Sequence, residues 1–189
     1  YQGRRMYTVD MRIVGEDGKL LPHDGKAFGE LQVKGHAIID GYHEDEEASV
    51  AAMTEDGWLK TGDVARITPE GFMMLVDRTK DLIKSGGEWI SSIDLENAAQ
   101  GHPSIMECAV ISAYHPQWGE RPLLIAVTEN DVTLNLEDIH EYLNDKVAKW
   151  WLPDDVVFVE ELPHTATGKI SKMTLREQFK DYKFEHSES

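Results

Sequence analysis

A glycine turn followed by an acidic residue is the first feature of the sequence that could do chemistry. In the stretch 58–63, Gly62 permits a sharp turn and Asp63 follows at its edge. A carboxylate in that place can accept two hydrogen bonds from a vicinal diol such as a ribose. Taken alone, the pattern is also that of an ordinary surface turn, so it needs support from elsewhere in the chain.

A second feature gathers cations and glycines in an otherwise acidic chain. Residues 77–90 contain three basic side chains, a glycine pair and a tryptophan, namely Arg78, Lys80, Lys84, Gly86, Gly87 and Trp89. Glycines let a backbone approach a ligand closely and present amide groups to phosphate or carbonyl oxygens. The alternative is a solvated basic hairpin whose aromatic ring belongs to the core.

The third feature is a loop rich in threonine and glycine, residues 163–170, that presents a single lysine, Lys169. An ammonium group is a compact point charge with three donors, which suits it to holding an anionic oxygen. The loop is not a Walker phosphate loop, because the earlier glycine and the preceding strand are missing. As a bare pattern, it is more typical of a surface loop.

The charge balance limits the partners. The 189 residues carry a formal net charge of -16, from 19 Lys and Arg against 35 Asp and Glu. Because nucleic-acid binding is driven by clustered Lys and Arg, this balance argues against a nucleic-acid partner. It also argues against electrostatic docking on an anionic membrane. An anionic substrate would be repelled unless local cations reversed the field where it binds.

The remaining reactive residue types predict no further site. Cys108 lies in the apolar run 105–111 and is expected to be an inert thiol of the core. A single cysteine fits a reducing compartment, and we expect a cytoplasmic location. The eight histidines show no metal-ligand spacing, so no metal site is expected. No apolar stretch reaches the ~20 residues that span a bilayer.

The elements that must position these residues change character near residues 78–80. Before that point, short alternating strands separated by glycine turns dominate, for example 7–14 and 29–35. Beyond it, helices alternate with strands expected at 105–112, 123–128 and 156–159. The sequence therefore predicts an α+β chain with a strand-rich first piece and a compact second piece.

Three helices are expected in the second piece. Polar residues that can accept hydrogen bonds from free backbone amides mark their starts, namely Ser92, Asn135 and Thr174. The helix after Asn135 shows apolar residues at helical spacing down to Trp150. The last helix is expected to open on a capping box between Thr174 and Glu177. The polar tail, residues 185–189, is expected to fray.

The order and spacing of the three features resemble one family. A Trp-Leu-Lys-Thr-Gly-Asp segment ends at Asp63, and Asp-Arg-x-Lys-Asp-Leu-Ile-Lys-Ser-Gly-Gly-Glu begins at Asp77. Pro-x-Thr-x-x-Gly-Lys then ends at Lys169. This set resembles the adenylate-forming superfamily of acyl-CoA synthetases, adenylation domains and luciferases, and it covers essentially the whole chain. Residues 85–97 are most similar to medium- and long-chain fatty-acid–CoA ligases.

The resemblance implies a division of the chain. Residues 81–189 would be a small α+β C-terminal lid domain, with a mixed or antiparallel sheet and flanking helices. Residues 78–80 would be a hinge. Residues 1–77 would be the β-rich end, a distorted barrel, of the large adenylation domain. The chain would then be the C-terminal fragment of a longer enzyme.

The resemblance also implies roles for the nucleotide side of the site. Asp63 and Arg78 resemble the residues that hold the ribose of ATP and of the acyl-adenylate. Lys80 resembles the hinge residue, which in fatty-acyl ligases also contacts nucleotide. Lys169 resembles the catalytic lysine that bridges the attacking carboxylate and the α-phosphate. His164 stands where relatives often carry arginine, a departure that could weaken a phosphate contact.

On the thiol side, Lys84, Gly87 and Trp89 match positions that line the path of CoA. The implied reaction converts ATP, a fatty acid and CoA into acyl-CoA, AMP and pyrophosphate through an acyl-adenylate. A lysine between two negative centres offsets their repulsion and stabilises the transition state of the first step. Rotation about Lys80 would then withdraw Lys169 and bring the CoA-side residues to the acyl carbon.

Several parts of the family's site are missing from this sequence, namely the Ser/Thr/Gly-rich phosphate loop, the Tyr-Gly-x-Thr-Glu segment and the acyl pocket. We therefore expect the chain alone to be inactive, and we expect Mg²⁺ to be bound outside it. The alternatives are a ligase for aryl or amino acids, an acyl-AMP ligase that serves a carrier protein, and a non-catalytic acidic binding module. A homodimer through the exposed barrel remnant is a further possibility.

Overall fold

The computed structural model describes residues 1–129 and 132–184, so the expected fraying of the tail 185–189 lies outside the described residues. The chain divides into two compact units, one ending at Lys80 and the next beginning at Asp81. Each unit is described by itself. The expected α+β class is confirmed. Among the described residues, no helix is long and apolar enough to cross a membrane.

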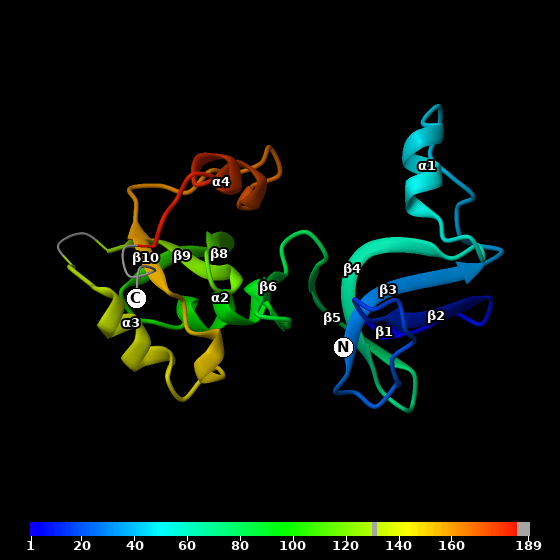
Figure 1. Ribbon diagram of the computed structural model, residues 1–189, viewed down its shortest axis with the longest axis horizontal. Coiled ribbons are helices and arrows are strands. Elements are labelled where there is room, and N and C mark those ends of the chain that lie inside the picture. The colour runs from blue at the N-terminus through cyan, green and yellow to red at the C-terminus, as the bar shows by residue number, and fades with distance from the viewer. Residues whose placement is uncertain (130–131, 185–189) are drawn as a thin grey trace. The chain divides into compact units, whose positions relative to one another are not determined.

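The first unit is an antiparallel five-stranded sheet in the order β1-β5-β4-β3-β2. Its strands are β1 Gly3–Arg4, β2 Val9–Val14, β3 Phe28–Gly35, β4 Leu59–Ile67 and β5 Phe72–Arg78. The strands β1 and β2 lie at opposite edges, so the described residues form an open sheet rather than a closed barrel. The long strand β4 bends strongly along its length (Figure 1).

The first unit has a small core on one face of its sheet, and its helix adds no residue to that core. Ile13, Leu31, Ala65 and Ile67 are buried on one face of the sheet. The helix α1, Glu46–Ala52, begins where the Asp45 side chain accepts a hydrogen bond from the Ala48 amide, and none of its own residues is buried. The helix accordingly stands away from the sheet (Figure 1).

The second unit is built on a sheet centred on β9. The strands are β6 Ile83–Ser85, β7 Glu88–Ile90, β8 Ile105–His115, β9 Gly119–Thr128 and β10 Asp155–Phe158. The helices are α2 Ser92–Gln100, α3 Leu136–Leu143, the short 3₁₀ helix Lys149–Trp151 and α4 Lys172–Gln178. The strand β9 pairs antiparallel with β8 and parallel with β10, so the sheet is mixed, as expected.

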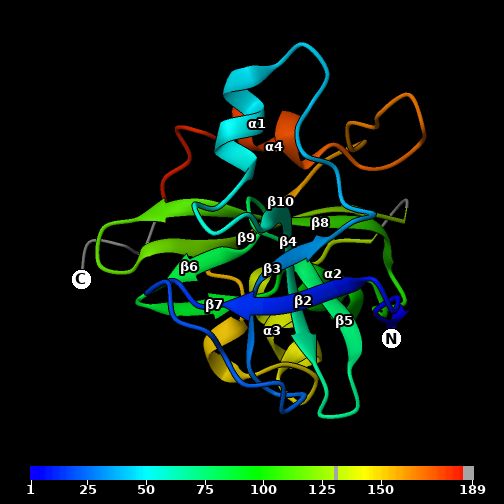
Figure 2. The ribbon, with the colours of Figure 1, turned by 90° about the vertical axis from the view of Figure 1, so that its right-hand side faces the viewer.

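Alternation along β8 divides the apolar residues between two cores. Cys108 and Val110 face the core that contains residues of α2 and α3. Ala109 and Ile111 face the core that contains Leu175 of α4. Because successive side chains of a strand point to opposite faces, both faces of the sheet are covered. Both views show α4 on one face of this sheet and α3 on the other (Figures 1 and 2).

Two of the three expected helix starts are shifted in the structure. The helix α2 is capped by Ser91, whose hydroxyl accepts from the Asp94 amide, and not by Ser92. The helix α4 is capped by Ser171, and Thr174 is its third residue, because the chain turns back at Ser171 rather than three residues later. The expected capping of α3 is confirmed.

The cap of α3 is a full capping box, although the helix is shorter than expected. The Asn135 side chain accepts from the Asp138 amide, and the Asp138 side chain accepts from the Asn135 amide. The helix ends at Leu143 instead of continuing to Trp150. Asn144 and Asp145 follow, and both have weak helix propensity, so the α-helix stops before them. Further along, the chain forms only the short 3₁₀ helix Lys149–Trp151.

A charged pair ties α2 and α4 to the outer side of β8. The Glu96 carboxylate accepts a hydrogen bond of 2.7 Å from the Val110 amide. The Lys172 ammonium lies 2.7 Å from the same Glu96 oxygen and donates a 2.7 Å hydrogen bond to the Ser92 hydroxyl. The Lys172 and Glu96 side chains are 15% and 19% exposed, so water screens the pair only weakly. Loss of the lysine would leave a poorly solvated carboxylate.

We therefore expect the Lys172→Met variant to lower the free energy of unfolding of the second unit. Hydrogen bonds to charged groups contribute about 2 kcal/mol, which corresponds to a fall in Tm of about 10 °C for a unit of this size. Calorimetry measures the effect. The matched control is Lys180→Met, since Lys180 pairs with Glu177 on the surface, with side chains 59% and 75% exposed. Equal Tm values for the two variants would contradict this assignment.

Candidate functional site

In the first unit, the structure brings together two of the predicted site residues. Asp63 on β4 is the ladder partner of Arg78 on β5. The Arg78 Nε atom lies 2.9 Å from the Asp63 Oδ1 atom, with side chains 55% and 27% exposed. A carboxylate and a guanidinium therefore stand side by side at the surface. One can accept and the other can donate hydrogen bonds to the hydroxyls of a sugar.

The backbone around Asp63 is fixed from both sides. The Thr61 hydroxyl donates to the Leu31 carbonyl oxygen at 2.9 Å and accepts from the Asp63 amide at 3.1 Å. The Thr79 amide donates to the Gly62 carbonyl oxygen at 2.9 Å. Gly62 has a φ of 73°, which favours glycine, but it lies inside β4 where the ladder to β3 shifts register, so the expected tight turn is wrong and a strand irregularity stands in its place. These hydrogen bonds hold Asp63 on β4 in place beside Arg78 on β5.

In the second unit, β6 and β7 form a hairpin with the glycine pair as its turn. Lys84 and Trp89 are cross-strand partners, with Lys84 exposed and Trp89 partly buried. Gly86 and Gly87 have φ values of 57° and 87°, so both positions favour glycine. Nothing lies within 4 Å of the point where a Cβ atom on Gly87 would sit. The turn therefore has open space beside its backbone at Gly87.

Lys169 is exposed at the end of a tight hairpin loop in the second unit. The Thr165 amide donates to the Lys169 carbonyl oxygen at 2.7 Å, and the Lys169 amide donates to the Thr165 hydroxyl at 3.2 Å. Gly168, with a φ of 79°, donates its amide to the Thr165 carbonyl oxygen. The backbone is thus ordered by its own Thr and Gly residues while the lysine side chain reaches solvent.

His164, the residue that departs from the family pattern, lies at the base of this loop. It bridges to Ile170 across the hairpin, and its Nε2 atom lies 3.3 Å from the Glu107 Oε1 atom on β8. The imidazole is therefore directed to a carboxylate of the sheet. From this position, His164 can support the Lys169 loop rather than act on the lysine side chain.

The predicted residues thus fall into three places. Asp63, Arg78 and Lys80 belong to the first unit. The hairpin residues, around Gly87, and the loop of Lys169 belong to the second. The residues that support the hairpin, Trp118, Arg121 and Trp150, were not predicted from the sequence. The available indication was a lone arginine, Arg121, followed by the apolar run Pro-Leu-Leu-Ile-Ala.

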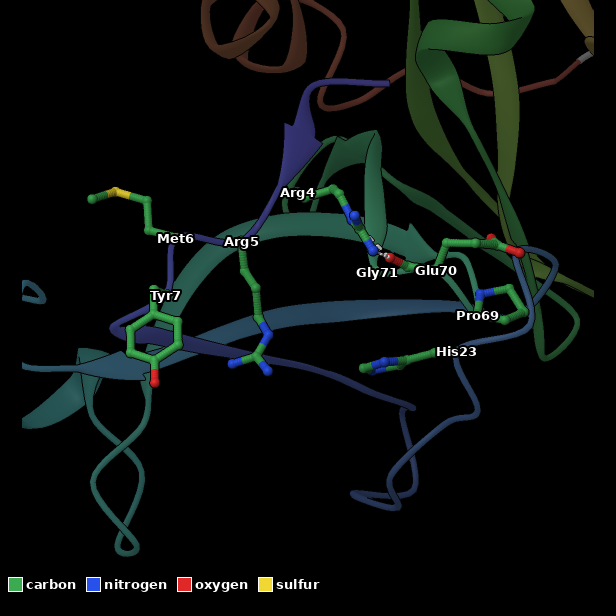
Figure 3. Close-up of a pocket in the computed structure, with 8 residues that line it drawn as sticks. All are labelled: Arg4, Arg5, Met6, Tyr7, His23, Pro69, Glu70 and Gly71. Atoms are coloured by element: carbon green, nitrogen blue, oxygen red, sulfur yellow. Dashed lines mark hydrogen bonds between the residues drawn. The ribbon is translucent and has the colours of Figure 1, made fainter.

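The first unit also has a pocket of about 530 Å³, which lies apart from the predicted site residues. It is lined by Arg4, Arg5, Met6, Tyr7, His23, Pro69, Glu70 and Gly71 (Figure 3). Arg4 Nε donates to the Glu70 carbonyl oxygen at 2.8 Å, and Arg5 is paired with Asp10. None of the predicted site residues lines this pocket. Its cations are engaged by protein oxygens, so it does not match the expected nucleotide site.

The thiol of Cys108 is buried, as expected. Burial, and secondarily the Glu96 carboxylate, raises the pKa of the thiol to about 12. We therefore expect the native chain to resist a thiol alkylating reagent at pH 8, where only about 10⁻⁴ of the thiol is thiolate. Labelling followed by mass spectrometry measures this, with the unfolded chain in denaturant as the control. Full labelling of the native chain within minutes would contradict the assignment.

Comparisons with known proteins find a matching domain family and similar chains. Residues 94–169 match the AMP-binding enzyme C-terminal domain. The chain is 49% identical to a 3-methylmercaptopropionyl-CoA ligase of Ruegeria pomeroyi, over 95% of this chain and 33% of the relative. It is 50% identical to a long-chain-fatty-acid–CoA ligase of Thermus thermophilus, over 92% and 32%.

A solved structure extends the likeness to three dimensions. ATP-bound MatB from Rhodopseudomonas palustris superimposes with a TM-score of 0.82 at 31% identity, over 96% of this chain and 36% of that one. The chain therefore belongs to the acyl-CoA ligase family of adenylate-forming enzymes. It spans about a third of the length of the curated relatives it matches.

Proposed function

We propose that the chain is the C-terminal portion of an AMP-forming fatty-acid–CoA ligase, in which the unit beginning at Asp81 acts as the lid. Residues 1–77 would end the adenylation domain, 78–80 would be the hinge and 81–189 the lid. The division of the chain between Lys80 and Asp81 supports this assignment. High identity to a fatty-acid–CoA ligase supports the acyl class.

The adjacent Asp63 and Arg78 would hold the ribose of ATP and then of the acyl-adenylate. Their ion pair of 2.9 Å keeps both groups at the same surface point, where the carboxylate accepts from the ribose hydroxyls. The exposed Lys80 follows two residues later and would add a contact to the nucleotide. The overall acidity of the chain makes these local cations important, since they offset repulsion of an anionic substrate.

Lys169 would act in the first half-reaction. A carboxylate oxygen attacks the α-phosphorus of ATP, the bond to the bridging oxygen breaks, and pyrophosphate leaves with that electron pair. An ammonium between the carboxylate and the α-phosphate stabilises the charge of the transition state. An exposed lysine on a loop ordered by its own backbone contacts suits this role, because the side chain can enter a site formed elsewhere.

The second half-reaction would require Lys169 to leave. The CoA thiol attacks the acyl carbon, its proton is lost, and AMP departs as the leaving group. Rotation of the lid about Lys80 would exchange the lysine loop for the Gly87 turn. The open space beside Gly87 suits the passage of the narrow pantetheine arm. Lys84 and Trp89 flank that turn and would line the same path.

The remaining expectations depend on the longer enzyme. Mg²⁺ would be held by residues outside this chain, and the chain by itself would not catalyse either step. A cytoplasmic location and a homodimer stay predictions.

The proposal rests on one observation, the Asp63–Arg78 pair at the surface of a chain that also carries the Lys169 loop. The test is product analysis of the full-length enzyme with ATP, free CoA and a panel of acids. The panel includes fatty acids of several lengths, aryl acids and the 3-methylmercaptopropionate suggested by one relative. Equal amounts of acyl-CoA and AMP with fatty acids support the proposal. Acyl transfer only to a carrier protein, or ADP in place of AMP, would refute it.

A further inference from the structure

The β6–β7 hairpin is tied to the rest of the second unit by few main-chain contacts. In the part of the chain that the structure describes, β6 joins β9 at one residue pair, Ser85 with Gly119. The Glu120 carboxylate adds a hydrogen bond of 2.8 Å from the Lys84 amide. A hairpin with so little ladder pairing needs side chains to set its position.

A pair of tryptophans, Trp118 and Trp150, packs against the turn and forms its seat. The Gly86 amide donates to the Trp118 carbonyl oxygen at 2.9 Å. A Cβ atom on Gly86 would lie 2.9 Å from Trp118 Cε3 and 3.5 Å from Trp150 Cζ2. The two indole rings meet edge to face, with centroids 4.8 Å apart and an interplanar angle of 86°. The glycine backbone therefore rests directly on the aromatic pair.

Arg121 connects this seat to the hairpin. Its Nη1 atom donates to the Ser85 hydroxyl at 3.1 Å and to the Trp150 carbonyl oxygen at 2.9 Å. Its Nη2 atom donates to the Leu152 carbonyl oxygen at 3.1 Å, and its Nε atom lies 2.7 Å from Asp154 Oδ1. The guanidinium also lies 4.5 Å from the centroid of the Trp150 ring.

The energetics of this arrangement favour a positioning role. Arg121 is only 6% exposed, and desolvation of a buried ion pair offsets much of its attraction. Well-packed apolar side chains would stabilise the unit about as well. What apolar side chains would not provide is a set of directed hydrogen bonds that fixes β6, the 149–152 turn and Asp154 relative to one another.

We propose that Trp118, Trp150 and Arg121 are positioning residues for the thiol step. They hold the Gly86–Gly87 turn where the pantetheine arm of CoA passes, and they act through that turn without touching the reacting atoms. This inference rests on the proposed function. It assigns control of the affinity for the thiol substrate to side chains outside the three sequence features that carry the resemblance.

The test compares both half-reactions in the full-length enzyme carrying Trp118→Ala. We expect the KM for CoA to rise by between about ten- and a hundredfold, because a displacement of about 1 Å can cost that much. Pyrophosphate release with ATP and the acid should stay within about twofold. Trp118→Phe, which keeps an aromatic ring under Gly86, should restore most of the affinity. If Trp118→Ala fails to fold, the residual rise in the KM for CoA of Trp118→Phe, whose ring is smaller than the indole, tests the inference by itself, and an unchanged KM would overturn it.

Tyr142→Ala is the matched control, since Tyr142 packs edge to face on His102 in the same unit, with centroids 4.8 Å apart. It removes an aromatic ring away from the hairpin and should leave the KM for CoA unchanged. An unchanged KM in both Trp118 variants, or an equal loss of both half-reactions, would overturn the inference. A wild-type enzyme that makes no acyl-CoA would refute the proposed function itself, which separates the two failures.

Discussion

Replacing Lys169 with alanine in the full-length enzyme is expected to slow carboxylate-dependent adenylation by about 10²–10³. The ammonium is the group proposed to neutralise two converging anions, so its loss acts on the transition state of the first step. Thioester formation from preformed acyl-adenylate should be largely spared, because the lysine is absent from that step. Pyrophosphate release and single-turnover thiolysis measure the two steps separately.

Lys180→Ala provides the control for the loss of one positive charge. Lys180 is an exposed lysine of the same unit and pairs with Glu177 on the surface. We expect both half-reactions of this variant to match the wild type. If Lys169→Ala impaired both half-reactions equally, the lysine would serve binding or folding in general, and its assignment to adenylation would be wrong.

Introducing proline at Lys80 is expected to impair the second half-reaction by about tenfold or more. Proline fixes its own φ near -65° and disfavours the helical region for the preceding residue, Thr79. Both restrictions fall at the boundary between the two units, where the proposed rotation requires the backbone to change. Thiolysis of preformed acyl-adenylate should fall more than adenylation does.

Lys80→Ala separates the backbone from the side chain at this position. It removes the expected contact to the nucleotide while leaving backbone freedom intact. We expect it to raise the KM for ATP and to leave the rate of thiolysis near that of the wild type. Equal rates of thioester formation in Lys80→Pro and the wild type would rule out a hinge at this residue.

Local patterns predicted much of the fold, and long-range contacts account for the errors. The capping box at Asn135 depends on residues three apart, so it could be read directly from the sequence. The start of α2 was misplaced by one residue because Ser91 and Ser92 are chemically alike. What distinguishes them is Lys172, 80 positions away, which donates to the Ser92 hydroxyl. No local rule contains that contact.

The same difference between local patterns and long-range contacts applies to the candidate site. The neighbouring positions of Asp63 and Arg78 follow from one hairpin of adjacent strands, so spacing and resemblance together could indicate them. The seat of the β6–β7 turn could not be predicted in this way. It joins Gly86 to Trp118 and Trp150 through packing between segments far apart in the sequence. A buried arginine such as Arg121 reveals its partners only once the fold is known.

The central claim, that this chain serves an enzyme which activates a carboxylate as its adenylate, is tested most directly by following the carboxylate oxygen. The full-length enzyme is supplied with ATP, CoA and a fatty acid in which both carboxylate oxygens are heavy, and the AMP is examined by mass spectrometry. Attack on the α-phosphorus predicts that AMP acquires one heavy oxygen for each acyl-CoA formed. Acyl-CoA formed together with unlabelled AMP would contradict the account.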